Sequence, residues 1–329
     1  METPTSADSA QAEQIWQGLS KDGQKTLPPQ YLYDEVGSAL FESITKLPEY
    51  GLTKAEERNL RRCAEPVAEI CRSDVMVVEL GSGSGRKTRL ILEALARRGD
   101  PLDYFAIDVS QEALKQCGRE MEDIPGVSFT GVQGTYLEGL DEVLAQRPRG
   151  RQLLLLFLGS TLGNFEPEQA EDFLQSLSDK LQEGDLFLLG ADMVKGEEDL
   201  LTAYDDPAGV TAAFNLNLLS RLNREWDADF RHDRFEHHVR YDEDLQRVEM
   251  HLRSLQDQDV RLGEFGARLR LRRGETIHTE SSHKFRPEDL QRMAGQAGFR
   301  IARCWVDDQW PFADCLLSVD HPLDNEELI

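Results

Sequence analysis

The sequence has little cysteine, and none of it falls in the spacing that metal sites and redox motifs use. Five cysteines stand among 329 residues without a Cys-x-x-Cys pair. An odd, dispersed set of this kind favours reduced thiols over a disulfide framework or a zinc site: Cys63, Cys71, Cys117, Cys304 and Cys315. His232, His237 and His238 are spaced loosely like ligands, but they stand in a charged stretch, so we expect no metal.

Long hydrophobic runs and a leader-like N-terminus are missing too. The longest apolar run, Leu153 to Leu158, is far too short to span a bilayer. Met1 to Glu13 is polar and acidic, without the basic region and apolar stretch of a signal peptide. We therefore expect a cytoplasmic protein, with residues 1–13 as a disordered tail.

Positive charge is also scarce, because 37 lysines and arginines face 61 aspartates and glutamates, a net charge of −24. Such a field repels nucleic acid and anionic membranes, so we expect neither as a partner. A small zwitterionic or cationic substrate suits it better, and we expect a monomer. Hydrophobic residues make up 40% of the chain, which is enough for a sizeable core.

Strands and helices alternate through the first part of the chain. Segments that look like strands lie at residues 75–80, 104–108, 127–132, 152–159 and 185–191. Helical patterns separate them at residues 87–98, 111–121 (capped by Ser110), 137–144 and 167–181. This rhythm predicts an α/β fold with a doubly wound, Rossmann-like sheet, whose ligands bind beyond the carboxyl ends of the strands.

The rhythm changes after Asp192. Residues 197–226 look helical with breaks at Pro207 and Gly209, and residues 235–274 alternate like antiparallel strands. A helix at 287–298 and strands at 300–306 and 314–319 follow. We predict a Rossmann-like domain (61–195 and 286–321), an inserted α+β substrate lobe (196–285), and a helical segment (14–60, with Thr53 as an N-cap) packing on that lobe.

A glycine-rich loop follows the first strand and carries the cofactor signal. Glu79-Leu-Gly81-Ser-Gly83-Ser-Gly85 lets the backbone approach a ligand closely, but its third glycine comes one residue early for a dinucleotide fingerprint. The acid before the loop and Asp108 at the end of the second strand favour S-adenosylmethionine over NAD. The alternative interpretation of Asp108 is that it only caps the N-terminus of the following helix.

Several longer segments together resemble the histidine-specific methyltransferase family, whose members make trimethylhistidine (hercynine) for ergothioneine. The segments are residues 33–38, 47–50, 79–87, 157–164, 204–211 and 279–285, and the match as a whole runs from about Tyr31 to Leu317. The resemblance implies a Rossmann-like methyltransferase core and a lobe that closes over an amino acid. It further implies methylation of the α-amino group of L-histidine.

Residue roles follow from the same resemblance. Cofactor contacts are implied for Glu79, Gly81, Gly83, Lys87 and Asp108, and catalysis for Asn164 and Tyr33. Substrate contacts are implied for a second set: Tyr50, Asn164, Tyr204, Met250, Glu280 and Ser282. Glu280 and Ser282 are two residues apart, so in extended chain both face one side and can address the two imidazole nitrogens. By spacing alone, Met250 is a core residue.

Two departures from the family pattern bear on the substrate. Gly51-Leu52 replaces a tyrosine and a proline that the family often has, and Gly134-Thr135-Tyr136 stands where an acid usually follows the third strand, so we expect the backbone or Thr135 to make the cofactor contact. A related branch methylates a prenylated tryptophan, against which the acidic Glu280 argues. An α-N-methyltransferase for another amino acid, a binding module without catalysis and an NAD-dependent oxidoreductase remain the alternatives.

Overall fold

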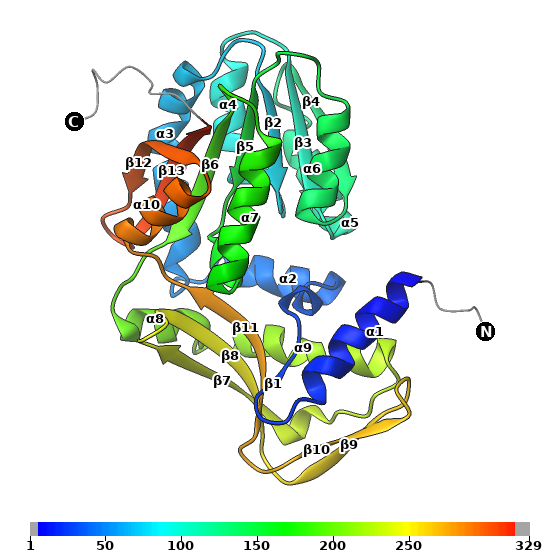
Figure 1. The fold of residues 1–329 in the computed structure, drawn as a ribbon. Coiled ribbons are helices and arrows are strands. Elements are labelled where there is room, and N and C mark those ends of the chain that lie inside the picture. Colours follow the sequence, from blue (N-terminus) through cyan, green and yellow to red (C-terminus); the bar gives the residue numbers. More distant parts are fainter. Residues whose placement is uncertain (1–5, 320–329) are drawn as a thin grey trace. The chain divides into compact units, whose positions relative to one another are not determined.

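The computed structural model describes residues 6–319, which form two units (Figure 1). Of the described residues, 6–50 and 196–282 form unit 1, and 51–195 and 283–319 form unit 2. Residues 51–60, predicted to belong to the N-terminal segment, lie in unit 2. The reason is that α3 (Gly51–Ile70) is one continuous helix, and its buried residues join the core of unit 2.

A seven-stranded sheet forms the centre of unit 2, with the order β12-β13-β6-β5-β2-β3-β4. Its parallel strands are β2 (Met76–Leu80), β3 (Leu102–Asp108), β4 (Val127–Gln133), β5 (Leu153–Phe157) and β6 (Leu186–Asp192). The chain then returns in antiparallel β12 (Phe299–Val306) and β13 (Phe312–Val319). The predicted Rossmann-like α/β core is confirmed.

Helices cover both faces of this sheet. One apolar core contains residues of α6 (Tyr136–Ala145), α7 (Pro167–Lys180) and α10 (Pro287–Gln296). The other contains residues of α3, α4 (Arg89–Ala96) and α5 (Gln111–Met121). Along β5, Leu155 points into the first core and Leu154 into the second, and both are fully buried. Burial on both faces explains why this strand is almost purely apolar.

The helix starts show how far local sequence decides structure. Ser110 caps α5 as predicted, since its Oγ accepts a hydrogen bond from the Ala113 amide at 3.2 Å. The prediction of Thr53 as an N-cap is wrong, because α3 already begins at Gly51. A side chain at residue 51 would overlap the Trp310 indole, so glycine lets the helix start against that ring.

Unit 1 combines helices with a four-stranded sheet of order β1-β11-β8-β7 and a two-stranded ribbon, β9–β10. The strands are β1 (Lys25–Thr26), β7 (Phe235–Asp242), β8 (Arg247–Ser254), β9 (Gln258–Leu262), β10 (Ala267–Leu271) and β11 (Thr276–His283). The helices are α1 (Ser6–Leu19), α2 (Glu35–Ile44), α8 (Glu197–Tyr204) and α9 (Val210–Glu225), with short 3-10 turns at Pro29–Leu32 (η1) and His232–Arg234 (η3).

Two features of unit 1 differ from the predictions. Helix α1 begins at Ser6, inside the stretch 1–13 predicted as a disordered tail, and residues 1–5 lie outside the described residues. Strand β11 was not predicted as a strand; it pairs in parallel with β1, with Lys25 opposite Ile277. Within residues 6–319, no helix has the length and hydrophobicity that crossing a membrane requires.

Candidate active site

The loop after β2 bends through three glycines in the left-handed region. The φ angles of Gly81, Gly83 and Gly85 are 73°, 52° and 72°, values that side-chain-bearing residues rarely adopt. A Cβ at Gly83 would meet no atom within 4 Å, whereas one at Gly81 would lie 3.3 Å from the Tyr136 ring. The loop therefore presents bare backbone at Gly83, which leaves room for a ligand.

Asp108 holds this loop at the carboxyl end of β3. Its Oδ2 accepts a hydrogen bond from the Gly83 amide at 3.0 Å, and its Oδ1 accepts one from the Ser110 amide at 2.9 Å. Burial raises the pKa of the Asp108 carboxyl, and the backbone amides oppose that shift. A carboxylate has about four acceptor positions, so about two are left for the hydroxyls of a ribose.

Glu79 faces the interior rather than the open side of the loop. Its Oε1 accepts from Thr88 Oγ1 at 2.6 Å, its Oε2 accepts from the Tyr104 hydroxyl, and only 3% of the residue is exposed. Burial raises its pKa to about 7. Both oxygens thus serve the fold, and the predicted cofactor contact of Glu79 stays a prediction.

Lys87 is held by a carboxylate that the sequence analysis missed. Its Nζ pairs with Oε2 of Glu56, a residue with no exposed surface on α3. Burial lowers the pKa of Lys87, but the charge and hydrogen bond of Glu56 together with nearby acidic charges outweigh burial, so the pKa is raised overall. An acid on the apolar face of a helix, next to Ala55 and Leu60, was the available signal.

Thr135 lies at the start of α6, on the exposed surface. Its Oγ1 donates a hydrogen bond to Oε2 of Glu138 at 2.6 Å. Tyr136, next in the chain, was not predicted, yet its ring lies against Gly81. An aromatic residue directly after the third strand's loop was the signal for it.

Asn164 ends the 3-10 turn η2 (Thr161–Asn164) that follows β5. Ser160 enters the turn with a left-handed φ of 58°, and its Oγ accepts a hydrogen bond from the Asp192 amide at 2.8 Å. A Cβ at Gly163 would lie 2.7 Å from the His283 carbonyl oxygen. The turn is therefore fixed from two neighbouring segments, which suits a side chain that orients a reacting group.

Unit 1 gathers the predicted tyrosines into one aromatic cluster. The Tyr33 ring lies 5.5 Å from those of Phe41 and Phe214, centroid to centroid. The Tyr50 ring lies 6.5 Å from Phe41 and 6.1 Å from Tyr204. The sequence analysis missed the two phenylalanines, because their positions in α2 and α9 read as ordinary helix core.

Glu280 and Ser282 both point from β11 toward this cluster. The Tyr33 hydroxyl donates to Glu280 Oε1 at 3.4 Å, and the Tyr204 hydroxyl donates to Ser282 Oγ at 2.7 Å. Both residues are nearly buried, with 7% and 4% exposed. Burying polar groups in so apolar a setting costs free energy unless the groups are hydrogen-bonded. A buried carboxylate and hydroxyl held in this way are typical of a site that binds a polar side chain.

Met250 lies on β8 in the interior, with 2% exposed. It stands opposite Val239 of β7, and its carbonyl oxygen accepts from Thr279 Oγ1 at 3.0 Å. The backbone of Met250 thus braces β11 one residue before Glu280. Contact of its side chain with a substrate stays a prediction.

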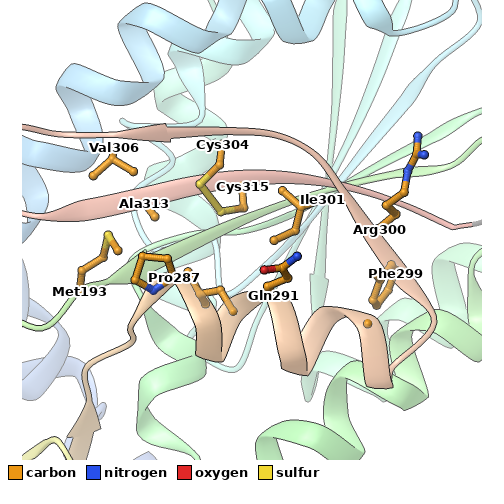
Figure 2. Close-up of a pocket in the computed structure, with 12 residues that line it drawn as sticks. Met193, Pro287, Gln291, Phe299, Arg300, Ile301, Cys304, Val306, Ala313 and Cys315 are labelled. Carbon is orange, nitrogen blue, oxygen red and sulfur yellow. A yellow bond between two sulfur atoms is a disulfide. The ribbon is translucent and has the colours of Figure 1, made fainter. Parts of the chain in front are cut away.

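A hollow of about 550 Å³ lies elsewhere in unit 2, between α10 and the β12–β13 hairpin (Figure 2). It is lined mainly by apolar side chains and contains none of the predicted site residues. Cys304 and Cys315 face it and form a disulfide, so the prediction that all five thiols are reduced is wrong. The sequence could not reveal this pair, because only the β12–β13 register sets the two residues opposite each other.

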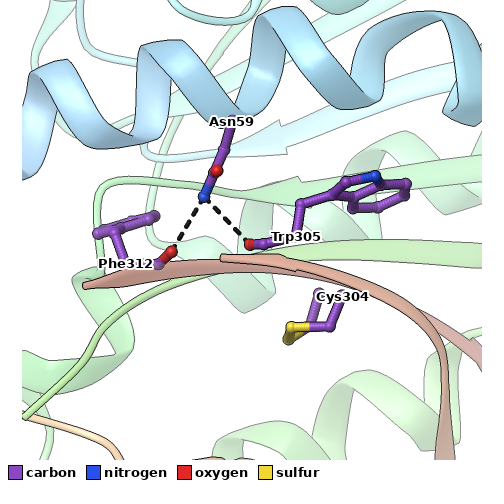
Figure 3. Close-up of a disulfide and its surroundings, with 5 residues drawn as sticks. Asn59, Cys304, Trp305 and Phe312 are labelled. Atoms are coloured by element: carbon purple, nitrogen blue, oxygen red, sulfur yellow. Dashed lines mark hydrogen bonds between the residues drawn. A yellow bond between two sulfur atoms is a disulfide. The ribbon is translucent and has the colours of Figure 1, made fainter. Parts of the chain in front are cut away.

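The hairpin is also tied to α3 through Asn59 (Figure 3). Asn59 has no exposed surface, and its Nδ2 donates to the carbonyls of Trp305 and Phe312 at 3.1 and 3.0 Å. No group of three or more His, Cys, Asp or Glu side chains within residues 6–319 is arranged to hold a metal ion.

Known proteins resemble this chain over almost its full length. The family model for SAM-dependent, histidine-specific methyltransferases matches residues 11–319. A histidine N-alpha-methyltransferase from Mycobacterium tuberculosis is 42% identical, covering 91% of each chain. The Mycolicibacterium smegmatis protein of that name is 40% identical, covering 93% of this chain and 94% of the relative. An L-tryptophan methyltransferase from Psilocybe serbica is 27% identical, covering 93% and 91%.

Proposed function

The chain belongs to the SAM-dependent, histidine-specific methyltransferases, and from this premise we propose that it methylates the α-amino nitrogen of L-histidine. We propose further that transfer is repeated to give trimethylhistidine. The observation that carries the substrate assignment is the pairing of Glu280 with Tyr33 and of Ser282 with Tyr204.

The cofactor loop fits a nucleoside that carries an amino acid. Gly81 and Gly83 offer backbone at close approach, Asp108 retains acceptor positions for ribose hydroxyls, and Lys87 offers a cation. We assign these four residues to the cofactor and keep Thr135 as a further contact, with Glu79 shaping the loop from within. When bound, S-adenosylmethionine supplies a methyl group that its sulfonium has already activated.

The imidazole of histidine matches the polar pair on β11. A carboxylate accepts a hydrogen bond from one ring nitrogen, and a hydroxyl can donate to or accept from the other. An aliphatic side chain could form a hydrogen bond with neither Glu280 nor Ser282, and an indole, which has one N–H donor and no acceptor, could bond with only one of them. Sites of this kind reject analogues strongly, which supports histidine over leucine, phenylalanine and tryptophan.

Asn164 and Tyr33 are the proposed catalytic residues. The Asn164 amide can bond both the α-amine and the carboxylate of an amino acid, which would aim the nitrogen lone pair. The α-ammonium must first lose a proton, and a water held by the Tyr33 hydroxyl is the proposed acceptor. Tyr50 and Tyr204 complete an aromatic wall that stabilises a growing cationic ammonium.

The decisive assay offers all twenty amino acids with the methyl donor and detects products by mass spectrometry. Histidine should have the highest kcat/KM. A rival that exceeds it by about tenfold, or about 1.4 kcal/mol in the transition state, would refute the substrate assignment. The methyltransferase assignment itself fails if no amino acid is methylated.

Variants on β11 test the polar pair directly. Glu280→Met with Ser282→Val should lower kcat/KM for histidine by about 100-fold or more and admit an apolar amino acid. Ser281→Ala is the matched control: it removes a hydroxyl from the residue between them, whose partner is His278 at 3.0 Å. Its activity should stay within about twofold of wild type, because alternate strand residues face opposite sides.

Asn164→Ala tests the orienting role. The variant should lower kcat by about 100-fold while the melting temperature and the affinity for S-adenosylhomocysteine stay near wild type. Near-normal kcat in the folded variant would remove Asn164 from the mechanism.

We also propose a cytoplasmic monomer with small-molecule partners alone. The net charge of −24 supports the exclusion of nucleic acid and anionic membranes. Light scattering tests the monomer, co-sedimentation with anionic vesicles and gel shift with DNA test the exclusions, and cell fractionation tests the location.

A further inference from the structure

One buried carboxylate in unit 2 has two different partners on its two oxygens. Glu56 Oε2 pairs with Lys87 Nζ, while Glu56 Oε1 accepts a hydrogen bond from the Gly159 amide at 2.6 Å. Lys87 is an assigned cofactor residue, and Gly159 lies two residues after the end of β5, directly before Ser160, which enters the turn that ends at Asn164. The carboxylate thus contacts both a cofactor residue and the base of the substrate turn.

The surrounding chain leaves room for this carboxylate. Gly190 on β6 stands where any side chain would overlap Glu56 Oε1. Gly159 has a left-handed φ of 77°, and a Cβ there would lie 3.3 Å from Lys87 Nζ. Two glycines therefore allow Glu56, Lys87 and the β5 turn to come into direct contact.

A second buried acid, Asp314, interacts electrostatically with Glu56. Asp314 on β13 has no exposed surface, and neither of its carboxylate oxygens has a hydrogen-bond partner among the described residues. Burial and the neighbouring Glu56 charge raise the pKa of Asp314 far above its usual range. The carboxylate that pairs with the Lys87 ammonium is therefore Glu56 and not Asp314.

We propose that Glu56 is a positioning residue for methyl transfer: it fixes the Lys87 ammonium with one oxygen and the Gly159–Asn164 turn with the other. Cofactor binding and alignment of the amine then depend on the same side chain. This inference rests on the proposed function, since it takes Lys87 as a cofactor contact and Asn164 as the residue that orients the amine.

The test separates the two oxygens by comparing a single variant, which keeps the Glu56 bond to Gly159, with a double variant that removes both bonds. Lys87→Met removes the ammonium. The double variant Glu56→Met with Lys87→Met removes the whole ion pair, which avoids an unpaired carboxylate or ammonium. For each we would measure the melting temperature, the Kd of S-adenosylhomocysteine, the donor KM, and kcat at saturating donor.

Lys87→Met should weaken S-adenosylhomocysteine by about tenfold but keep kcat within about threefold, because the Gly159 anchor remains. The double variant should bind S-adenosylhomocysteine like Lys87→Met, within about twofold, yet show a kcat about tenfold lower than that variant. If the folded double variant has the kcat of Lys87→Met, the positioning role is refuted.

Two further variants keep the proposal testable if the double variant does not fold. Glu56→Gln keeps an acceptor for Gly159 and removes the charge, so only the affinity for S-adenosylhomocysteine should fall, by about fivefold or more. Asp314→Asn keeps the size of this buried side chain and removes its ionisable group, and it should change affinity and kcat by less than about twofold. Unchanged affinity in Glu56→Gln, or a tenfold loss in Asp314→Asn, would overturn the assignment.

These outcomes are distinct from failure of the proposed function. If wild type does not methylate histidine, the function is wrong whatever the variants do. If wild type methylates histidine and the variants lack the expected differences in kcat and in the Kd of S-adenosylhomocysteine, the proposed function stands and only the role of Glu56 is refuted.

Discussion

Replacing Asp108 by alanine should weaken binding of S-adenosylhomocysteine by about 1–3 kcal/mol, because the ribose loses charge-assisted hydrogen bonds. That loss corresponds to a Kd about 5- to 150-fold higher. Two of the carboxylate's acceptor positions are filled by the amides of Gly83 and Ser110 at 3.0 and 2.9 Å, which leaves about two for the ligand. Asp108→Asn keeps one acceptor oxygen and should lie between alanine and wild type.

Isothermal titration calorimetry measures this effect, and Asp103→Ala is the matched control. Asp103 lies near the other end of β3 and pairs with Arg151, far along the strand from the glycine loop. Its removal should leave the Kd within about twofold of wild type. The assignment of Asp108 fails if the alanine variant is folded and binds S-adenosylhomocysteine normally, or if both variants weaken binding equally.

Three further predictions concern unit 2. In the folded protein the pKa of Glu79 is about 7, above its usual 4.5. Raising the pH between these values therefore lowers the free energy of unfolding of wild type. Urea unfolding of Glu79→Gln should therefore show a stability relative to wild type that rises by about 3 kcal/mol from pH 4.5 to 8; a pH-independent difference would contradict this. Asn59→Ala removes a buried donor from the carbonyls of Trp305 and Phe312, of which Phe312 keeps the Asp307 amide, and should cost about 1–3 kcal/mol; a loss below about 0.5 kcal/mol in urea unfolding would refute that. In thermal unfolding, Cys304→Ser should lower the stability by about 2–3 kcal/mol in oxidising buffer and leave it unchanged in reducing buffer. If the melting temperature of wild type is the same with and without reductant, the disulfide is excluded.

Most strands and helices of unit 2 could be predicted from local sequence patterns such as hydrophobic runs, turn residues and helix caps. Strands β2, β5 and β6 are mainly apolar runs bounded by turn residues, and α5 has its cap in Ser110, so neighbours in sequence decide these elements. Strand β11 has no such pattern, since Thr279 to Ser282 are polar on both faces yet buried. Only the surrounding sheet and the aromatic cluster make a strand of it, and neither can be seen along one segment.

Partners distant in sequence were the part that could not be predicted. The resemblance named Glu280, Ser282, Tyr33 and Tyr204, but not which hydroxyl meets which group. Glu56 and Lys87 are 31 residues apart, and their contact depends on α3 packing beside the glycine loop. Periodicity describes faces of single elements, whereas ion pairs and the cysteine bridge depend on tertiary register.

The parallel pairing of β1 with β11 has a consequence for synthesis of the chain. Gln24 donates to the Thr276 carbonyl across a separation of 252 residues, beside the paired Lys25 and Ile277. At a translation rate of about 5–20 residues per second, β1 waits roughly 10–50 s for its partner strand to leave the ribosome. The five parallel strands of unit 2 are made in between, so co-translational folding can complete their pairing well before unit 1 closes its sheet.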